Sequence, residues 1–258
     1  LWDPKRPKKE LKYMKRNETF ELVLTSLFVA LIFLLGFVPQ IGFITLVPGN
    51  PITIIHIPVL LAAVLFRRKY AFIPALAFGV VSLLQALMNQ VGFNVAFINP
   101  MVSILPRVLF AVAVHFLYQL LKKVVDKPVG YTLTLVGIGI VTIGGIILGV
   151  NEIFKQLDQI WINIIALGII LLFAGTYFYL YKKHNYKSLL VPSLFILGTL
   201  IHTIFVVVFA SIFSYDVLVT VFGSTDIVEI LVYLVGFNGM MEAVVAALIG
   251  TPIFLVLI

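Results

Sequence analysis

Three polar side chains near the start of one long apolar stretch are spaced so that they can act together. Asn99, Ser103 and Arg107 are four residues apart, so on a helix all three project from one face. At about 1.5 Å of rise per residue, Arg107 lies roughly 12 Å below Asn99, near the middle of a bilayer about 30 Å thick. An unpaired charge is costly there, so we expect the guanidinium to face a partner, a cavity or a ligand.

Further polar side chains occur in the other apolar stretches. Asn238 and Glu242 are again four residues apart, and Glu242 has the charge opposite to that of Arg107. Either the two charges form an ion pair that only ties two helices together, or Arg107 faces a cavity and binds an anionic or polar solute. The candidate substrate-binding residues are Asn50, His56, Gln85, Asn89, Asn99, Ser103, Arg107, His202, Asn238 and Glu242.

The sequence does not indicate an enzyme. His56 and His202 are single histidines in apolar helices, where they serve either as helix–helix hydrogen-bond partners or as ligands. Two histidines and one glutamate on three helices have no diagnostic metal-binding spacing, so we expect no metal site. No nucleotide-binding or zinc-protease motif occurs, and the absence of cysteine excludes thiol chemistry. We therefore expect no catalytic residues, no cofactor and no nucleotide hydrolysis by this chain.

The composition is that of a membrane protein. Of the 258 residues, 62% are hydrophobic and only 11% are charged, which leaves too little charge to cover the surface of a soluble domain. A basic segment precedes the first apolar run and no small-residue cleavage site follows it, so we expect this run to be retained. The sequence starts at Leu1 and stops at Ile258 within an apolar run, as in a chain trimmed at either end.

The basic residues define an orientation. Sixteen of the 18 Lys and Arg fall in four clusters, and each cluster is separated from the next by two apolar spans. By the positive-inside rule these clusters are cytoplasmic, and so is the N-terminus. The clusters are Lys5–Arg16, Arg67–Lys69, Lys122–Lys127 and Lys182–Lys187.

We predict an all-α, polytopic membrane helix bundle of eight spans. Loops 39–51 and 89–98 are expected to be external, and 39–51 is long enough to act as a lid. Pro106 should free the carbonyl of Val102 as a local acceptor. The expected spans are 20–38, 52–66, 70–88, 99–122, 130–150, 160–181, 188–210 and 228–256. The expected divisions are a basic cytoplasmic segment (1–18), a substrate-binding helical bundle (19–128 and 188–258) and an inserted transmembrane hairpin (129–187).

Four stretches, in this order, resemble the vitamin-binding S-components of energy-coupling-factor (ECF) transporters, and most of all the pantothenate-type branch. They are Ile52–Val59, Phe78–Leu84, Asn99–Arg107 and Gly198–Thr203. The resemblance covers about 20–122 and 188–258. It implies a six-helix core in the cell membrane of a prokaryote, so the hairpin at 129–187 is a departure from the family plan.

The resemblance also implies a mechanism and partners. Such a protein captures a vitamin beneath its external loops, then docks on a membrane coupling subunit driven by two ATPase subunits. Ser26 and Ala30 lie where the family's small-residue docking motif occurs in the first helix. Pantothenate suits Arg107 because it carries a carboxylate, while cobalamin and other vitamins remain alternatives. A membrane enzyme or scaffold that uses the polar stripe structurally is the competing class. No nucleic-acid partner is expected.

Overall fold

The computed structural model describes residues 18–38, 41–47, 50–66, 68–184 and 187–257. Within this described part, six helices are long and apolar enough to cross a membrane. The prediction of an all-α, multi-pass membrane bundle is therefore confirmed. The six helices are Glu18–Phe37, Tyr70–Met88, Pro100–Val125, Val129–Asn151, Leu190–Phe213 and Ile227–Phe254.

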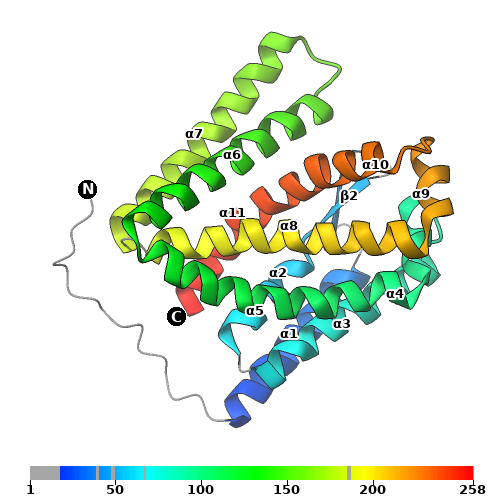
Figure 1. The fold of residues 1–258 in the computed structure, drawn as a ribbon, viewed down its shortest axis with the longest axis horizontal. Helices are drawn as coiled ribbons and strands as arrows, with labels where there is room; N and C mark the ends of the chain where they lie inside the picture. Colours follow the sequence, from blue (N-terminus) through cyan, green and yellow to red (C-terminus); the bar gives the residue numbers. More distant parts are fainter. Residues whose placement is uncertain (1–17, 39–40, 48–49, 67, 185–186, 258) are drawn as a thin grey trace.

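The elements follow one another with short connections, as Figure 1 shows. The first half contains α1 (Glu18–Phe37), β1 (Phe43–Val47), β2 (Asn50–Thr53), α2 (His56–Leu65), α3 (Arg68–Met88), the 3₁₀ helix η1 (Gly92–Ile98), α4 (Pro100–Ser103) and α5 (Leu105–Val125). The second half contains α6 (Pro128–Ile153), α7 (Gln159–His184), α8 (Lys187–Phe213), α9 (Tyr215–Phe222), α10 (Ile227–Tyr233), the π-helix η2 (Leu234–Gly239) and α11 (Met240–Leu257).

The structure differs from the prediction at residues 52–66, which we expected to form one span. Strand β2 pairs antiparallel with β1, with Phe43 opposite Thr53 and Ile44 opposite Ile52. Helix α2 has only ten residues, about 15 Å of helix, which is half of the hydrocarbon thickness. The β-branched run Ile52–Ile54 favours the strand. Helix α2 lies inside the bundle, and its residues 56–63 are all buried.

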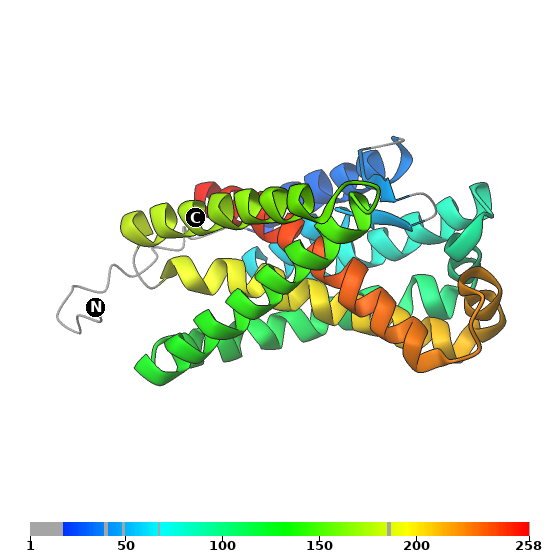
Figure 2. The ribbon, with the colours of Figure 1, turned by 90° about the horizontal axis from the view of Figure 1, so that it is seen from above.

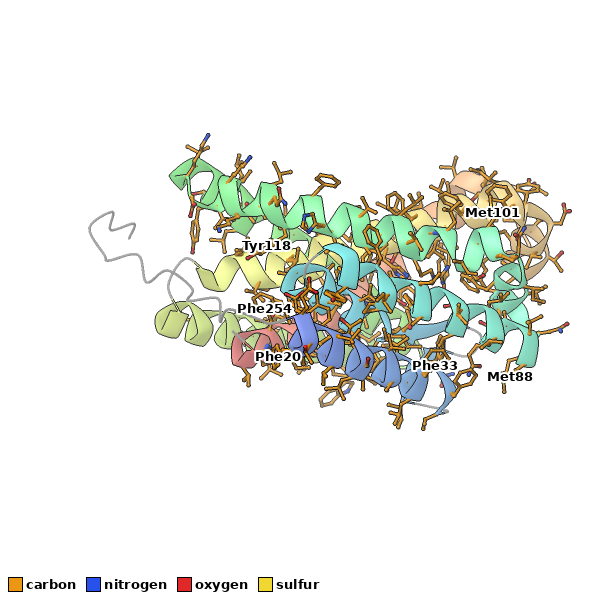
Figure 3. The ribbon with its side chains drawn as sticks, turned by 90° about the horizontal axis from the view of Figure 1, so that it is seen from below. Phe20, Phe33, Met88, Met101, Tyr118 and Phe254 are labelled. Carbon is orange, nitrogen blue, oxygen red and sulfur yellow. The ribbon has the colours of Figure 1, made fainter. Side chains whose placement is uncertain are left out.

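The long helices lie alongside one another around α2 (Figures 1 and 2). Elements η1, α4 and α9 gather at one end of the bundle, on the right of Figure 1. The sides of the bundle are apolar: Met88 and Met101 are exposed near that end (Figure 3), and Phe116 and Leu120 are exposed further along α5. Such an exposed apolar belt suits a lipid environment.

Helices α6 and α7 form the hairpin at the side of the bundle, and α6 packs on α11. The close approach depends on glycine, because a Cβ atom at Gly145 would lie 2.9 Å from Met240 Cβ and 3.0 Å from Met240 O. A Cβ at Gly149 would collide with the side chain of Met241. Small residues allow helices to approach closely in a membrane, so these glycines let α6 of the hairpin pack tightly against α11.

We expect Gly145→Leu to destabilise the bundle, because the new side chain meets the backbone of α11 and cannot be accommodated by a rotamer change alone. Overpacking of this kind costs about 1–3 kcal/mol, which should lower the Tm of the purified protein by several degrees. Gly137→Leu is the matched control on the same helix, since a Cβ there meets no atom within 4 Å. Equal Tm values for the two variants would contradict the tight α6–α11 contact.

Candidate solute-binding site

The backbone around Pro106 positions Arg107. Pro106 has no N–H group to donate to the carbonyl of Val102, and the helix is interrupted at Ile104, between α4 and α5. Arg107 Nη1 donates to Val102 O instead. The prediction that Val102 offers a free carbonyl is therefore confirmed, and the carbonyl holds the arginine side chain in place.

Arg107 is buried between aromatic rings. Its Cζ lies 4.7 Å from the ring centroid of Phe97 and 5.3 Å from that of Phe78, distances at which a cation is attracted to the ring faces. Only 4% of the residue is exposed. Among the described residues, Arg107 Nε has no hydrogen-bond partner. The guanidinium is thus held by two rings and one carbonyl and keeps a donor available for another acceptor.

Glu242 joins α11 to the β-hairpin. Its Oε1 accepts a hydrogen bond of 2.8 Å from the backbone N–H of Thr53 in β2. The residue follows the π-helix η2, which carries Asn238, and a π-turn within a helix is often found at a functional site. Of the segment 39–51 that we expected to act as a lid, residues 39–40 and 48–49 lie outside the described part of the chain. The rest contains β1 and the start of β2, and β2 is anchored to the wall of the cavity by this bond.

Arg107 and Glu242 line the same cavity, but no salt bridge joins them in the described part of the chain. Arg107 bonds to Val102 O, and Glu242 bonds to Thr53 N. The simple ion-pair interpretation thus does not describe the geometry. Two buried, opposite charges that face one space without pairing leave that space suited to a molecule with complementary groups.

The two buried histidines differ in their environment. His56 Nε2 is hydrogen-bonded to Thr199 Oγ1 at 3.0 Å, so His56 links α2 to α8. Its ring stacks on that of His202, with centroids 5.4 Å apart and planes inclined by 9°. Phe110 covers His202 edge-on, with centroids 5.0 Å apart. Both ring nitrogens of His202 lack a hydrogen-bond partner among the described residues.

The cavity contains about 840 Å³ of empty space, including its open mouth. Its wall combines aromatic and aliphatic side chains with a few polar groups, which is the usual make-up of a small-molecule site. Five of the ten candidate residues line it: Gln85, Arg107, His202, Asn238 and Glu242. The rest of the lining is Phe43, Thr53, Phe78, Ser82, Phe93, Asn94, Phe97, Thr203, Val206, Val207 and Leu234.

The structure gives the other candidates different surroundings. Asn99 caps α4 by accepting from Met101 N at 2.9 Å, and Ser103 Oγ donates to Asn99 O at 3.2 Å. Asn89 is exposed and donates to Gln85 Oε1 at 3.0 Å. His56 stacks on His202 and is not among the described residues that line the cavity. Asn50 begins β2, and its side chain lies outside the described part of the chain.

Several residues that line the cavity are not among the candidates predicted from the sequence. Ser82 lies three residues before Gln85, so helical spacing alone places it on the same face. Phe97 and Phe78 look like ordinary apolar residues in the sequence, and their role as covers for a guanidinium appears only in three dimensions. Thr53 acts through its backbone N–H, and a residue's type carries no signal for such a contact.

The fold also brings together the two histidines and the glutamate whose spacing in the sequence is not diagnostic of a metal site. One ligand atom from each of His56, His202 and Glu242 lies within 4.8 Å of the other two. Ligand atoms around a tetrahedral zinc ion with bonds of about 2.0–2.3 Å are roughly 3.4 Å apart. The three residues thus form a buried polar cluster whose separations stay within 4.8 Å, a limit that includes the spacing of zinc ligands.

The fold and the cavity define a multi-pass membrane protein with a buried polar site. No protein-family model matches the chain. The chain is 30% identical over 146 residues to the pantothenate transporter PanT of Leuconostoc mesenteroides subsp. mesenteroides, an alignment that covers 54% of this chain and 68% of the transporter. The chain therefore belongs to the same family as this transporter.

Proposed function

We propose that this protein is the substrate-binding subunit of an ECF-type importer and that it captures pantothenate from outside the cell. The relative named as a pantothenate transporter supports the substrate. The motif resemblance supports the ECF type, in which a coupling subunit and two ATPase subunits drive release. The protein itself is a transport subunit without catalytic residues or a cofactor.

The environment of Arg107 is the observation that carries the proposal. The residue is buried beside a cavity, and its Nε has no partner among the described residues. Pantothenate has one carboxylate, which can accept from this N–H in a charge-assisted hydrogen bond. Because the site is largely shielded from water, such a bond is stronger than it would be at a surface.

The charge distribution supports the proposed orientation in the plasma membrane. The start of α8 and the ends of α5 and α7 lie toward the left of Figure 1. Lys122 and Lys123 lie in the last turn of α5, and Lys127 directly precedes α6. We place this end, and the N-terminus, in the cytoplasm. The mouth of the site beside the β-hairpin then faces outward.

Calorimetric titration of the purified full chain with a vitamin panel tests the function. We expect pantothenate to bind stoichiometrically and to be recovered unmodified, which also separates a transport subunit from an enzyme. Pantothenol, in which an alcohol replaces the carboxylate, should bind far more weakly. Tight binding of cobalamin would assign a different substrate, and binding of none of the panel would refute the function.

We expect Ser26→Trp and Ala30→Trp to block uptake in cells and assembly with the coupling subunit, while pantothenate binding by the purified chain stays nearly unchanged. Both residues are exposed on the outer face of α1, and bulky side chains would hold a docking helix away. Co-purification and uptake assays measure this. Leu133→Trp, at a 66% exposed position on α6, is the control. Normal uptake by both α1 variants would place the interface elsewhere.

A further inference from the structure

His202 and Glu242 lie side by side at one part of the cavity, and the proposed binding of a carboxylate does not use them. One potential ligand atom of His202 lies within 4.8 Å of one carboxylate oxygen of Glu242. Both residues line the cavity and are buried, with 3% and 6% of their surface exposed. Buried polar groups without partners are rare in folded proteins, so the two ring nitrogens of His202, which have none among the described residues, require an explanation.

We propose that His202 and Glu242 form a subsite for a hydroxyl group of the ligand, so that the cavity selects small hydroxylated carboxylates. This inference rests on the proposed function and assigns the opposite end of the same ligand. A neutral histidine offers one donor and one acceptor. Glu242 keeps acceptor capacity after its bond to Thr53 N. A hydroxyl group both donates and accepts, so it can bond to the two residues at once.

The spacing agrees with a bridging hydroxyl. Two atoms that are each about 2.8 Å from one hydroxyl oxygen, with roughly tetrahedral geometry, are about 4.6 Å apart. The corresponding atoms of His202 and Glu242 lie within 4.8 Å. A bridging hydroxyl therefore fits within this limit.

Charge favours a hydroxyl over a metal ion. Arg107 lines the same cavity and is cationic, and Glu242 is the only acidic residue in the lining that the structure describes. A divalent cation would add two positive charges to a buried space that already holds a balanced pair, and buried charge without compensation is costly. A hydroxyl group satisfies one of the unpartnered nitrogens of His202 and adds no charge.

The Arg107 guanidinium and the His202–Glu242 pair then determine how the ligand lies. Its carboxylate is directed to Arg107 on α5, and its hydroxyl group to His202 on α8 and Glu242 on α11. Phe78 contacts both, since its ring centroid lies 5.3 Å from Arg107 Cζ and 5.4 Å from the His202 ring centroid, so it offers apolar surface to the carbon skeleton between them. Pantothenate, with a carboxylate at one end and hydroxyl groups at the other, has this distribution of groups.

A thermodynamic cycle with the purified full chain tests the inference. The ligands are pantothenate and its two analogues that each lack one hydroxyl group, and the variants are His202→Phe and Glu242→Gln. The wild type should bind one deoxy analogue at least about tenfold more weakly than pantothenate, because the site's polar groups are then unpaired. In His202→Phe this discrimination should disappear, and in Glu242→Gln, whose amide keeps hydrogen-bonding atoms, it should be reduced. Phenylalanine keeps the ring contacts of His202, so the fold should survive.

Arg107→Lys is the control, since it should weaken binding of all three ligands equally and keep the discrimination. Failure of the wild type to bind pantothenate would refute the proposed function. Equal binding of all three ligands by the wild type, or unchanged discrimination in the variants, would instead refute the hydroxyl subsite alone. A titration with ZnCl₂ completes the test: stoichiometric zinc binding that His202→Phe abolishes would assign the cluster to a metal and overturn the inference.

Discussion

Arg107→Ala is expected to weaken pantothenate binding by about 2–5 kcal/mol, the usual cost of losing one partner of a buried, hydrogen-bonded charge pair. This corresponds to a loss of affinity of at least about 30-fold. The reason is that Arg107 is the only cationic side chain in the described lining of the cavity. Calorimetry on the purified variant gives the affinity, and thermal unfolding of the same sample gives its stability.

Arg107→Lys should restore binding only in part. An ammonium group keeps the charge but loses the planar arrangement of N–H donors. It also loses the flat faces that lie against Phe78 and Phe97. The variant with lysine is thus the matched control for charge alone. Full recovery of affinity with lysine would show that the planar shape of the guanidinium contributes nothing to binding, which would contradict the proposed role of Arg107.

The same experiment separates ligand binding from a structural ion pair. If Arg107 and Glu242 stabilised the bundle by pairing, Arg107→Ala and Glu242→Gln would lower the Tm by similar, large amounts, since each would leave a buried charge unpaired. The observed partners, Val102 O and Thr53 N, are different for the two residues. We therefore expect a large effect on affinity and a smaller one on Tm. A well-folded Arg107→Ala protein with normal affinity would remove Arg107 from the site.

Much of the fold could be predicted because the signals are local. Apolar length defines the long helices, and the expected stretches 70–88 and 188–210 agree closely with α3 and α8. The free carbonyl at Val102 was also predictable, because it lies four residues before Pro106. Arg107, which donates to this carbonyl, directly follows the proline. Such features depend on neighbours in the sequence and not on the rest of the molecule.

The parts that were not predicted depend on contacts between distant segments. The bond from Thr53 N to Glu242 Oε1 joins residues 189 positions apart. The residues 52–66 are apolar enough for a span, but the β-branched start forms a strand because it can pair with β1. Asn99 shares a helical face with Arg107 in the sequence, yet it caps a helix, since the interruption at Ile104 changes the direction of the following side chains.

The hairpin α6–α7 also gains a structural explanation. Helix α6 contacts η2, α11 and β1, the three elements that contribute Asn238, Glu242 and Phe43 to the cavity. A rigid support of this kind keeps a binding site in its productive geometry. The glycines of α6 that face Met240 and Met241 therefore act on the site indirectly, through the position of α11.

Thr53→Pro is expected to have the second largest effect, because it removes the N–H group that binds Glu242. A hydrogen bond to a charged group contributes about 1.5–3 kcal/mol, and the carboxylate that is left behind is buried. The β-hairpin then loses its connection to α11, so pantothenate should dissociate faster and bind roughly tenfold more weakly. Proline is compatible with a position whose N–H does not serve the strand ladder.

Thr53→Ala separates the backbone from the side chain. It keeps the N–H group and removes only the hydroxyl, whose contacts with Gly42 O and Ile55 N are long, at 3.4 Å each. We expect near-normal affinity and dissociation for this variant. Glu242→Gln should retain the bond to Thr53, because the amide oxygen still accepts. Stopped-flow dissociation of the three variants decides the matter: if Thr53→Pro releases pantothenate no faster than Thr53→Ala, the bond does not hold the hairpin over the site.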